Sequence, residues 1–185
     1  MSDAFSISLA DLRHQEGSRL DVQRSIPAPD TFATALVRTV DTIEVEGALQ
    51  SVSEGVLVTA TIDFDTVAEC ARCLIDVEHS GQSDVTELYF YQNRAQALLE
   101  SGDDEVEEAP LIVNDAIDIE ALLRDTIVGQ MPFVPLCRED CPGLCAGCGE
   151  RLADLPEDHE HVDTSSDMSP LDELRAKLVA EEQGE

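Results

Sequence analysis

The residues with the clearest capacity for chemistry in this sequence are six cysteines, which fall into one pair and one cluster. In chain order they are Cys70, Cys73, Cys137, Cys141, Cys145 and Cys148. Two cysteines spaced as C-x2-C can direct both thiolates at one ion, and a tetrahedral zinc site with four sulfur ligands needs two such pairs. The spacing therefore predicts a structural metal site with zinc as the expected ion.

The simplest arrangement places Cys70 and Cys73 on one side of a zinc ion and Cys145 and Cys148 on the other. Glycines inside and directly after the second pair permit a tight turn and leave backbone amides free to point at sulfur.

Cys137 and Cys141 leave two alternatives open. They could complete the site in place of the last pair, or the four cysteines of the cluster could bind a metal alone. Spacing does not decide among the three arrangements. His159 and His161 are capable of binding metal, but their acidic surroundings favour a solvated spacer. Without a metal, the cysteines would be reduced thiols or a redox pair.

Other cysteine chemistry finds little support in the pattern. Cys141-x3-Cys145-x2-Cys148 has the spacing of radical S-adenosylmethionine enzymes, but only thirty-seven residues follow it, too few for the barrel such enzymes need. A cysteine nucleophile paired with His79 would lack any oxyanion feature. Since no phosphate loop or dinucleotide fingerprint is present either, we expect no catalytic residues and no enzyme.

Composition limits the partners and the compartment. Eleven lysines and arginines against forty aspartates and glutamates give the 185-residue chain a formal net charge of −29. This charge argues against a broad basic surface for nucleic acid. No apolar run approaches the roughly 20 residues that cross a bilayer. The first residues do not resemble a secretory signal, so we expect a cytoplasmic protein, in which disulfides rarely persist.

Most of the elements that must position the cysteines are expected to be strands. The segment between Leu9 and Asp30 is polar and irregular, but an alternating pattern begins at Val37. Strand patterns also occur at 74–78 and 84–91, so the first cysteine pair is expected at the tip of a hairpin-like turn. The clearest alternation puts five apolar residues on one face: Val56, Val58, Ala60, Ile62 and Phe64.

Two short helices complete the predicted domain, one over 93–100 and one that begins near Asp118 as N-cap. The acidic segment 102–108 is expected to be an exposed loop. These patterns predict an α+β fold: a β-rich antiparallel sheet with short helices and a Cys-based metal knuckle, plus a disordered acidic C-terminal tail. The expected parts are a domain over 1–152, an acidic disordered linker over 153–168 and an amphipathic helix over 169–182.

The few arginines lie close to the cysteines. Arg72 is inside the first pair, Arg138 follows Cys137, and Arg151 lies three residues after Cys148. They predict a contact surface for a phosphate or a partner's carboxylate. Alternatively, these arginines only offset the charge of the thiolates.

Several of these features occur in a specific order. They are Cys70-Ala-Arg-Cys73-Leu74, the acidic loop, Ile117-Asp-Ile-Glu120-Ala-Leu-Leu, Pro132 to Pro135, and the cluster from Cys137 to Gly149. Over about residues 5 to 152 this order resembles the YceD family of bacterial and plastid proteins. The resemblance implies a role in large-subunit ribosomal RNA accumulation, and hence in large-subunit assembly, without catalytic activity. Because some members lack part of the cysteines, it implies a structural metal that the shared activity does not require.

The charge and the resemblance together point to a protein partner. Ribosomal RNA repels a chain of this charge, whereas a basic ribosomal protein or a pre-ribosomal large-subunit particle attracts it. Direct contact with RNA is left open. We expect a non-enzymatic ribosome-assembly factor; the alternatives are a zinc-knuckle interaction module in transcription or stress regulation, and a thiol redox or metal-transfer protein.

Overall fold

The computed structural model describes residues 3–12, 15–102 and 106–161. The chain divides into two compact units, Met1–Cys137 and Arg138–Glu185. The helix predicted over 169–182 lies outside the described residues, as does the predicted linker from residue 162 onward.

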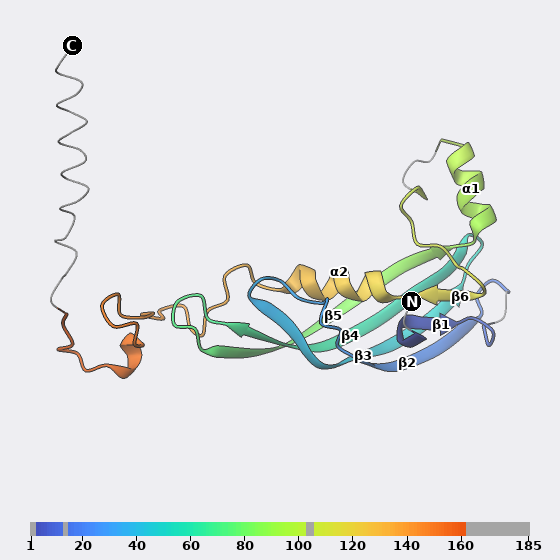
Figure 1. Cartoon of the computed structure of the whole chain (residues 1–185). Helices are drawn as coiled ribbons and strands as arrows, with labels where there is room; N and C mark the ends of the chain where they lie inside the picture. Colours follow the sequence, from blue (N-terminus) through green and yellow to red (C-terminus); the bar gives the residue numbers. More distant parts are fainter. Residues whose placement is uncertain (1–2, 13–14, 103–105, 162–185) are drawn as a thin grey trace, which may run out of the picture. The chain divides into compact units, whose positions relative to one another are not determined.

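The first unit is built on a four-stranded antiparallel sheet, which confirms the predicted α+β class (Figure 1). The strand order follows the sequence: β2 (Arg19–Pro27), β3 (Val37–Ser51), β4 (Gly55–Glu69) and β5 (Asp76–Phe90). The apolar alternation in β4 gives this sheet an inner face, because all five predicted residues from Val56 to Phe64 are buried.

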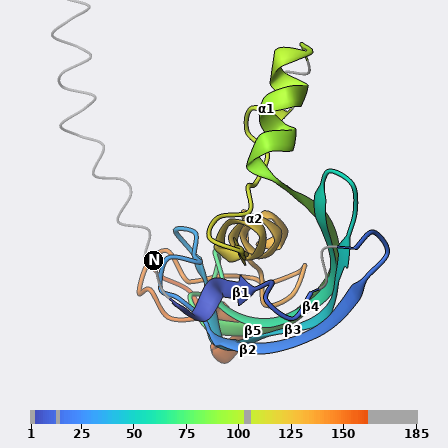
Figure 2. The same ribbon diagram turned by 90° about the vertical axis from the view of Figure 1, so that its right-hand side faces the viewer.

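One helix covers the inner face of the sheet. Figure 2 shows α2 (Glu120–Gln130) end-on inside the curve of the strands. Leu123 and Ile127 of this helix are fully buried and belong to the same hydrophobic core as Val56 and Ile62. Their spacing of four residues places both side chains on one helix face, so burial of that face holds the helix on the sheet.

Short elements fix the end of this layer at which α2 begins. The 3-10 helix η1 (Asp3–Phe5) leads into β1 (Ser6–Ser8), which pairs with β6 (Ala116–Asp118) just before α2. The Tyr89 hydroxyl of β5 donates a hydrogen bond to the Asp118 carbonyl oxygen at 3.1 Å. Burial of Tyr89 raises the pKa of its phenol, which therefore remains a donor. The short helix α1 (Gln92–Glu100) follows β5, as predicted.

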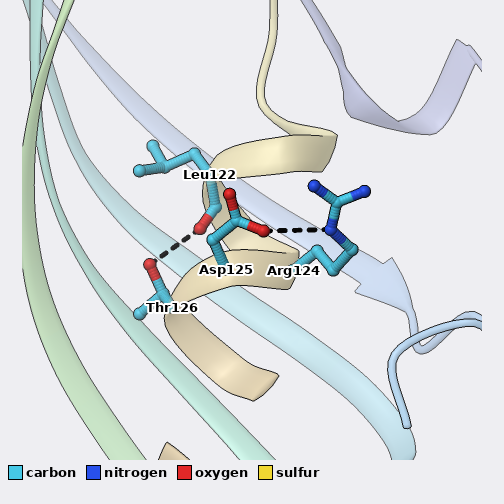
Figure 3. A network of polar contacts seen from close by, with 4 residues as sticks. All are labelled: Leu122, Arg124, Asp125 and Thr126. Carbon is cyan, nitrogen blue, oxygen red and sulfur yellow. Dashed lines mark hydrogen bonds and ion pairs between the residues drawn. The ribbon is translucent and has the colours of Figure 1, made fainter. Parts of the chain in front are cut away.

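The start of α2 differs slightly from the prediction. The N-cap position is Ile119 rather than Asp118. Asp118 nevertheless accepts a hydrogen bond from the Glu120 amide at 2.9 Å, so its carboxylate still satisfies a helix N–H. On the same helix the Thr126 hydroxyl donates to the Leu122 carbonyl oxygen at 2.7 Å, and Arg124 pairs with Asp125 at 3.0 Å (Figure 3).

Three segments differ from the sequence prediction. The segment read as polar contains β2, an edge strand of which only Ile26 is buried. The two strand patterns after Cys73 belong to one continuous strand, β5, which also includes the polar residues between them. In the acidic segment Val106 is buried while Glu107 and Glu108 are exposed, and 103–105 lie outside the described residues.

Candidate metal centre

The first cysteine pair lies in the turn between β4 and β5, which confirms the predicted hairpin. β4 ends at Glu69 and β5 begins at Asp76. Two backbone hydrogen bonds close the turn: the Leu74 amide donates to the Cys70 carbonyl at 2.9 Å, and the Cys70 amide donates to the Ile75 carbonyl at 2.8 Å. We call residues 70–75 the first turn.

Two further cysteines lie against this turn. The chain after α2 is attached to it by a hydrogen bond from the Ala71 amide to the Pro135 carbonyl at 2.8 Å. Cys137 follows two residues later, and its Sγ atom lies 3.7 Å from that of Cys73. The four Sγ atoms of the first cluster all lie within 4.8 Å of one another; they belong to Cys70, Cys73, Cys137 and Cys141.

The distance between sulfurs distinguishes a metal site from a disulfide. Zinc–sulfur bonds of about 2.3 Å at tetrahedral angles separate two sulfurs by about 3.8 Å. A disulfide would bring them to about 2.05 Å. The 3.7 Å between Cys73 and Cys137 fits the first geometry, and none of the six cysteines is in a disulfide. The first cluster therefore fits a tetrahedral zinc ion.

Backbone amides around Cys70 favour its thiolate. The amides of Cys137 and Arg72 donate to its sulfur and lower the pKa of this thiol to about 6. The thiolate is the form that binds metal, and such donors orient the ligand.

The second cysteine pair makes the same turn. The Gly149 amide donates to the Cys145 carbonyl at 2.8 Å, and the Cys145 amide donates to the Glu150 carbonyl at 2.7 Å. Amides of Cys148 and Gly147 donate to the Cys145 sulfur and lower the pKa of this thiol to about 6. We call residues 145–150 the second turn.

Two histidines complete a group at the second turn. Ligand atoms of Cys145, Cys148, His159 and His161 all lie within 4.8 Å of one another. The Cys148 Sγ atom lies 3.6 Å from Nε2 of His159. We call these four residues the second cluster.

The structure thus groups the candidate ligands in two sets. Cys70 and Cys73 are grouped with Cys137 and Cys141, the residues that the sequence offered as alternates. Cys145 and Cys148 are grouped with the histidines that the sequence favoured as spacer. The sequence feature that could have indicated the histidines as ligands is their H-x-H spacing after a C-x2-C pair. The acidic residues around them instead led to the prediction of a solvated spacer.

The three arginines near the cysteines differ in their surroundings. Arg72 is an exposed residue of the first turn. Arg138 pairs with Asp140 at 3.3 Å, and Arg151 pairs with Asp154 at 2.5 Å. Neighbouring carboxylates therefore engage Arg138 and Arg151.

A cleft of about 550 Å³ lies between β5 and α2. Its ionisable lining is mainly acidic and includes Glu87, Glu108 and Asp125. The cleft has neither cysteine nor histidine in its lining, so it does not pair a strong nucleophile with a base.

The fold and these clusters define a class: a small α+β protein whose sheet and following segment carry two cysteine turns of metal-knuckle form. The sequence profile of the family described as "Large ribosomal RNA subunit accumulation protein YceD" matches residues 58–175. The chain therefore belongs to the YceD family, which confirms the resemblance.

Mycobacterial relatives extend the match over most of the chain. An uncharacterized protein of Mycobacterium tuberculosis strain H37Rv is 34% identical over 167 residues, covering 88% of this chain and 78% of its own length. An uncharacterized protein of Mycobacterium leprae is 32% identical over 158 residues, covering 84% and 71%. No solved structure matches the chain. Among the described residues, no helix is both long and apolar enough to span a membrane.

Proposed function

We propose that this protein is a non-enzymatic factor that supports the accumulation of large-subunit ribosomal RNA and the assembly of the large subunit. The observation that carries the proposal is the match to the YceD family over residues 58–175. It acts in the cytoplasm by binding a basic ribosomal protein, free or within a pre-ribosomal particle.

Acidic side chains on the outer face of the sheet support the proposal of a basic partner. Strand register places Glu44 directly opposite Asp63, and it pairs Thr61 with both Glu46 and Asp84. These four carboxylates are exposed, and none forms an ion pair with a lysine or arginine of the described residues. We call Glu44, Glu46, Asp63 and Asp84 the acidic face.

Repulsion across the acidic face favours a cationic ligand. Like charges directly opposite each other on neighbouring strands destabilise a sheet. Here the neighbouring groups are polar but uncharged: Gln82 donates to Asp63 at 2.6 Å, and Thr61 donates to Asp84 at 2.7 Å. Lysines or arginines of a partner would lower this repulsion, and long-range attraction would speed their encounter.

The first cluster gives the domain a structural zinc site. Of the three arrangements that the cysteine spacing allows, the observed distances support the one in which Cys137 and Cys141 complete the site with Cys70 and Cys73. A zinc ion there would join the β4–β5 turn to the segment after α2. All four positions are occupied by protein ligands, as expected of a structural site without catalytic activity.

Depletion of the protein in its host tests the proposed function. We expect the ratio of large-subunit to small-subunit ribosomal RNA to fall, and large-subunit precursors to accumulate on gradients. Wild-type protein should restore the ratio. An unchanged ratio with impaired growth would overturn the proposal and favour a zinc-knuckle adaptor in transcription or stress regulation.

A charge-matched pair of variants tests the acidic face in the same cells. The first variant neutralises the face: Glu44→Gln, Glu46→Gln, Asp63→Asn and Asp84→Asn. The control neutralises four exposed acids elsewhere: Asp11→Asn, Glu16→Gln, Asp30→Asn and Glu100→Gln. Both variants gain four units of charge, so only the position differs. We expect the control, but not the face variant, to restore the ratio; equal rescue would exclude the acidic face.

Arg72 offers a separate test of partner contact. Replacement of its exposed side chain by alanine leaves the backbone amide that donates to Cys70 in place. Arg72→Ala should therefore weaken capture of pre-ribosomal particles from host lysate while the zinc content stays constant. Loss of zinc with unchanged capture would assign Arg72 to the metal site rather than to the partner.

A further inference from the structure

His159 and His161 are held beside the second turn by a local fold of the chain. The His159 amide donates to the Pro156 carbonyl at 3.0 Å, which closes a turn directly before the two histidines. Their ring centroids lie 4.5 Å apart and the rings are nearly perpendicular, at 83°. Both imidazoles also have a ring nitrogen within 4.8 Å of the sulfurs of Cys145 and Cys148.

Gly147 shows how closely the second histidine approaches the turn. A Cβ atom placed on Gly147 would lie 2.5 Å from Cγ of His161 and 2.9 Å from its Cβ. These distances are far below van der Waals contact, and they involve the base of the histidine rather than a flexible end. Glycine is therefore the residue at this position that allows His161 to lie against the turn.

The distance from cysteine to histidine fits one shared ion. Zinc–sulfur bonds of about 2.3 Å and zinc–nitrogen bonds of about 2.05 Å at a tetrahedral angle separate the two ligand atoms by about 3.6 Å. The Cys148 Sγ atom and Nε2 of His159 are 3.6 Å apart. Two thiolates and two imidazoles are also a ligand set that zinc commonly takes in structural sites.

We propose that Cys145, Cys148, His159 and His161 form a second zinc site, separate from the first cluster, so that each chain binds two zinc ions. With two thiolates and two neutral imidazoles the loaded site has a formal charge of 2 − 2 = 0, against 2 − 4 = −2 for four thiolates. The ion would join the second turn to residues 156–161. The histidine segment is therefore part of a folded zinc knuckle rather than a spacer.

Metal stoichiometry of the full chain tests this site. Protein purified with zinc and dialysed against metal-free buffer should contain two zinc ions per chain by mass spectrometry of the element. The double variant His159→Ala/His161→Ala should contain one. The control is His79→Ala, which removes an exposed histidine of β5 that belongs to neither cluster. One zinc in the wild type, or two in the double variant, would overturn the proposal.

This test separates two sites from the single site that joins Cys70 and Cys73 to Cys145 and Cys148. A single shared site would give one zinc per chain, and loss of the histidines would not change that number. Circular dichroism of each variant checks that the sheet is intact. Unfolding of the double variant would itself count against a self-contained knuckle.

Cobalt substitution provides a readout of the ligand type. In the full chain loaded with two Co²⁺ ions, we expect a four-thiolate spectrum and a two-thiolate, two-imidazole spectrum superimposed. The double histidine variant should retain only the four-thiolate component. A wild-type spectrum with a single four-thiolate component would overturn the proposal.

Gly147→Ala tests the site without removing a ligand. The added methyl group should push His161 away from the ion and weaken retention of the second zinc by about 10- to 100-fold, the effect typical of changes that disturb ligand orientation. Competition with a chromophoric chelator measures this affinity. Ala146→Ser, at the exposed neighbouring position, is the control. Equal affinities for the two variants would contradict the placement of His161.

Discussion

The two cysteine turns have the same pattern of backbone hydrogen bonds but differ in the residues that surround them. In each, the amide of the fifth residue donates to the carbonyl of the first, and the amide of the first donates to the carbonyl of the sixth. In each, amides of the third and fourth residues donate to the sulfur of the first cysteine. The turn is therefore a property of the C-x2-C segment, independent of where the chain places it.

The surroundings decide which ligands complete each turn. The first turn lies at the end of a long hairpin, where Cys70 and Cys73 are buried and two further cysteines approach. In the second turn Cys148 is exposed, and two histidines approach from a short polar segment. Buried thiolates suit a permanent structural ion, whereas the exposed site is open to solvent and to competing ligands.

Removal of each cysteine pair should give the largest difference in stability between the two turns. We expect Cys70→Ser/Cys73→Ser to destabilise the sheet by about 3 kcal/mol or more, because binding of a structural metal adds to the folding free energy. Cys145→Ser/Cys148→Ser should change it by less than about 1 kcal/mol, since this turn lies outside the sheet. Urea unfolding of the zinc-loaded full chain, followed by the β-sheet signal, measures both. Equal losses would remove the distinction between the two turns.

Metal release should separate the turns kinetically. With excess chelator we expect two phases of equal amplitude, a fast one from the more exposed second cluster and a slow one from the more buried first cluster. The slow phase should follow local opening of the hairpin, which costs more free energy than exposure of the second turn. The histidine double variant identifies the fast phase by its absence. A single phase with both zinc ions released together would contradict the comparison.

The sequence predicted the parts of the fold that depend on local pattern. Alternation over Val56 to Phe64 identified β4 and its buried face, and strand patterns on both sides of Cys70 and Cys73 identified the hairpin. The edge strand β2 was missed because Arg24 interrupts the apolar alternation of Leu20, Val22 and Ile26, and only Ile26 of these is buried.

Continuity of β5 depends on a tertiary contact. Gly81 interrupts the pattern, but it pairs with Phe64 on β4, and a Cβ atom there would lie 2.5 Å from that ring. The strand therefore continues through a glycine because the neighbouring aromatic ring occupies the space of a side chain.

The sequence predicted which residue types could bind metal, but not which residues come together at each site. Spacing alone identified the six cysteines and the two turns. The approach of Cys137 to the first turn depends on the path of the chain after α2, fixed by the hydrogen bond between Ala71 and Pro135. The histidines depend on a turn at Pro156 that has no strong sequence signature. Both are contacts of the folded chain, which C-x2-C spacing cannot specify.

The fifth position of the turns provides a smaller test. Leu74 has a φ of 60°, and Gly149 at the same position has a φ of 77°. A left-handed backbone costs a non-glycine residue about 1–2 kcal/mol, partly offset by the greater freedom of glycine when unfolded. Leu74→Gly should therefore stabilise the sheet by up to about 1 kcal/mol. Leu74→Ala, which keeps the Cβ atom, should give no gain in the same urea experiment; equal gains would exclude backbone strain at this position.

Substitution at the third position of the first turn should have the smallest effect, and the same position of the second turn should respond differently. Arg72 occupies it in the first turn and Gly147 in the second. At the metal site, this residue donates its backbone amide to sulfur in both turns, and glycine supplies the same amide. Arg72→Gly should therefore leave the zinc content unchanged and the stability within about 0.5 kcal/mol, as for most exposed substitutions.

In the second turn, the methyl group that Gly147→Ala adds would collide with the imidazole of His161 and should weaken metal retention. Substitution at the third position should therefore affect the two turns unequally. Zinc affinity and unfolding free energy of both variants, measured side by side, check this. A loss of zinc in Arg72→Gly comparable with that in Gly147→Ala would show that the turns need different third residues for reasons of backbone geometry. The histidine would then not be the cause, because no imidazole is part of the first cluster.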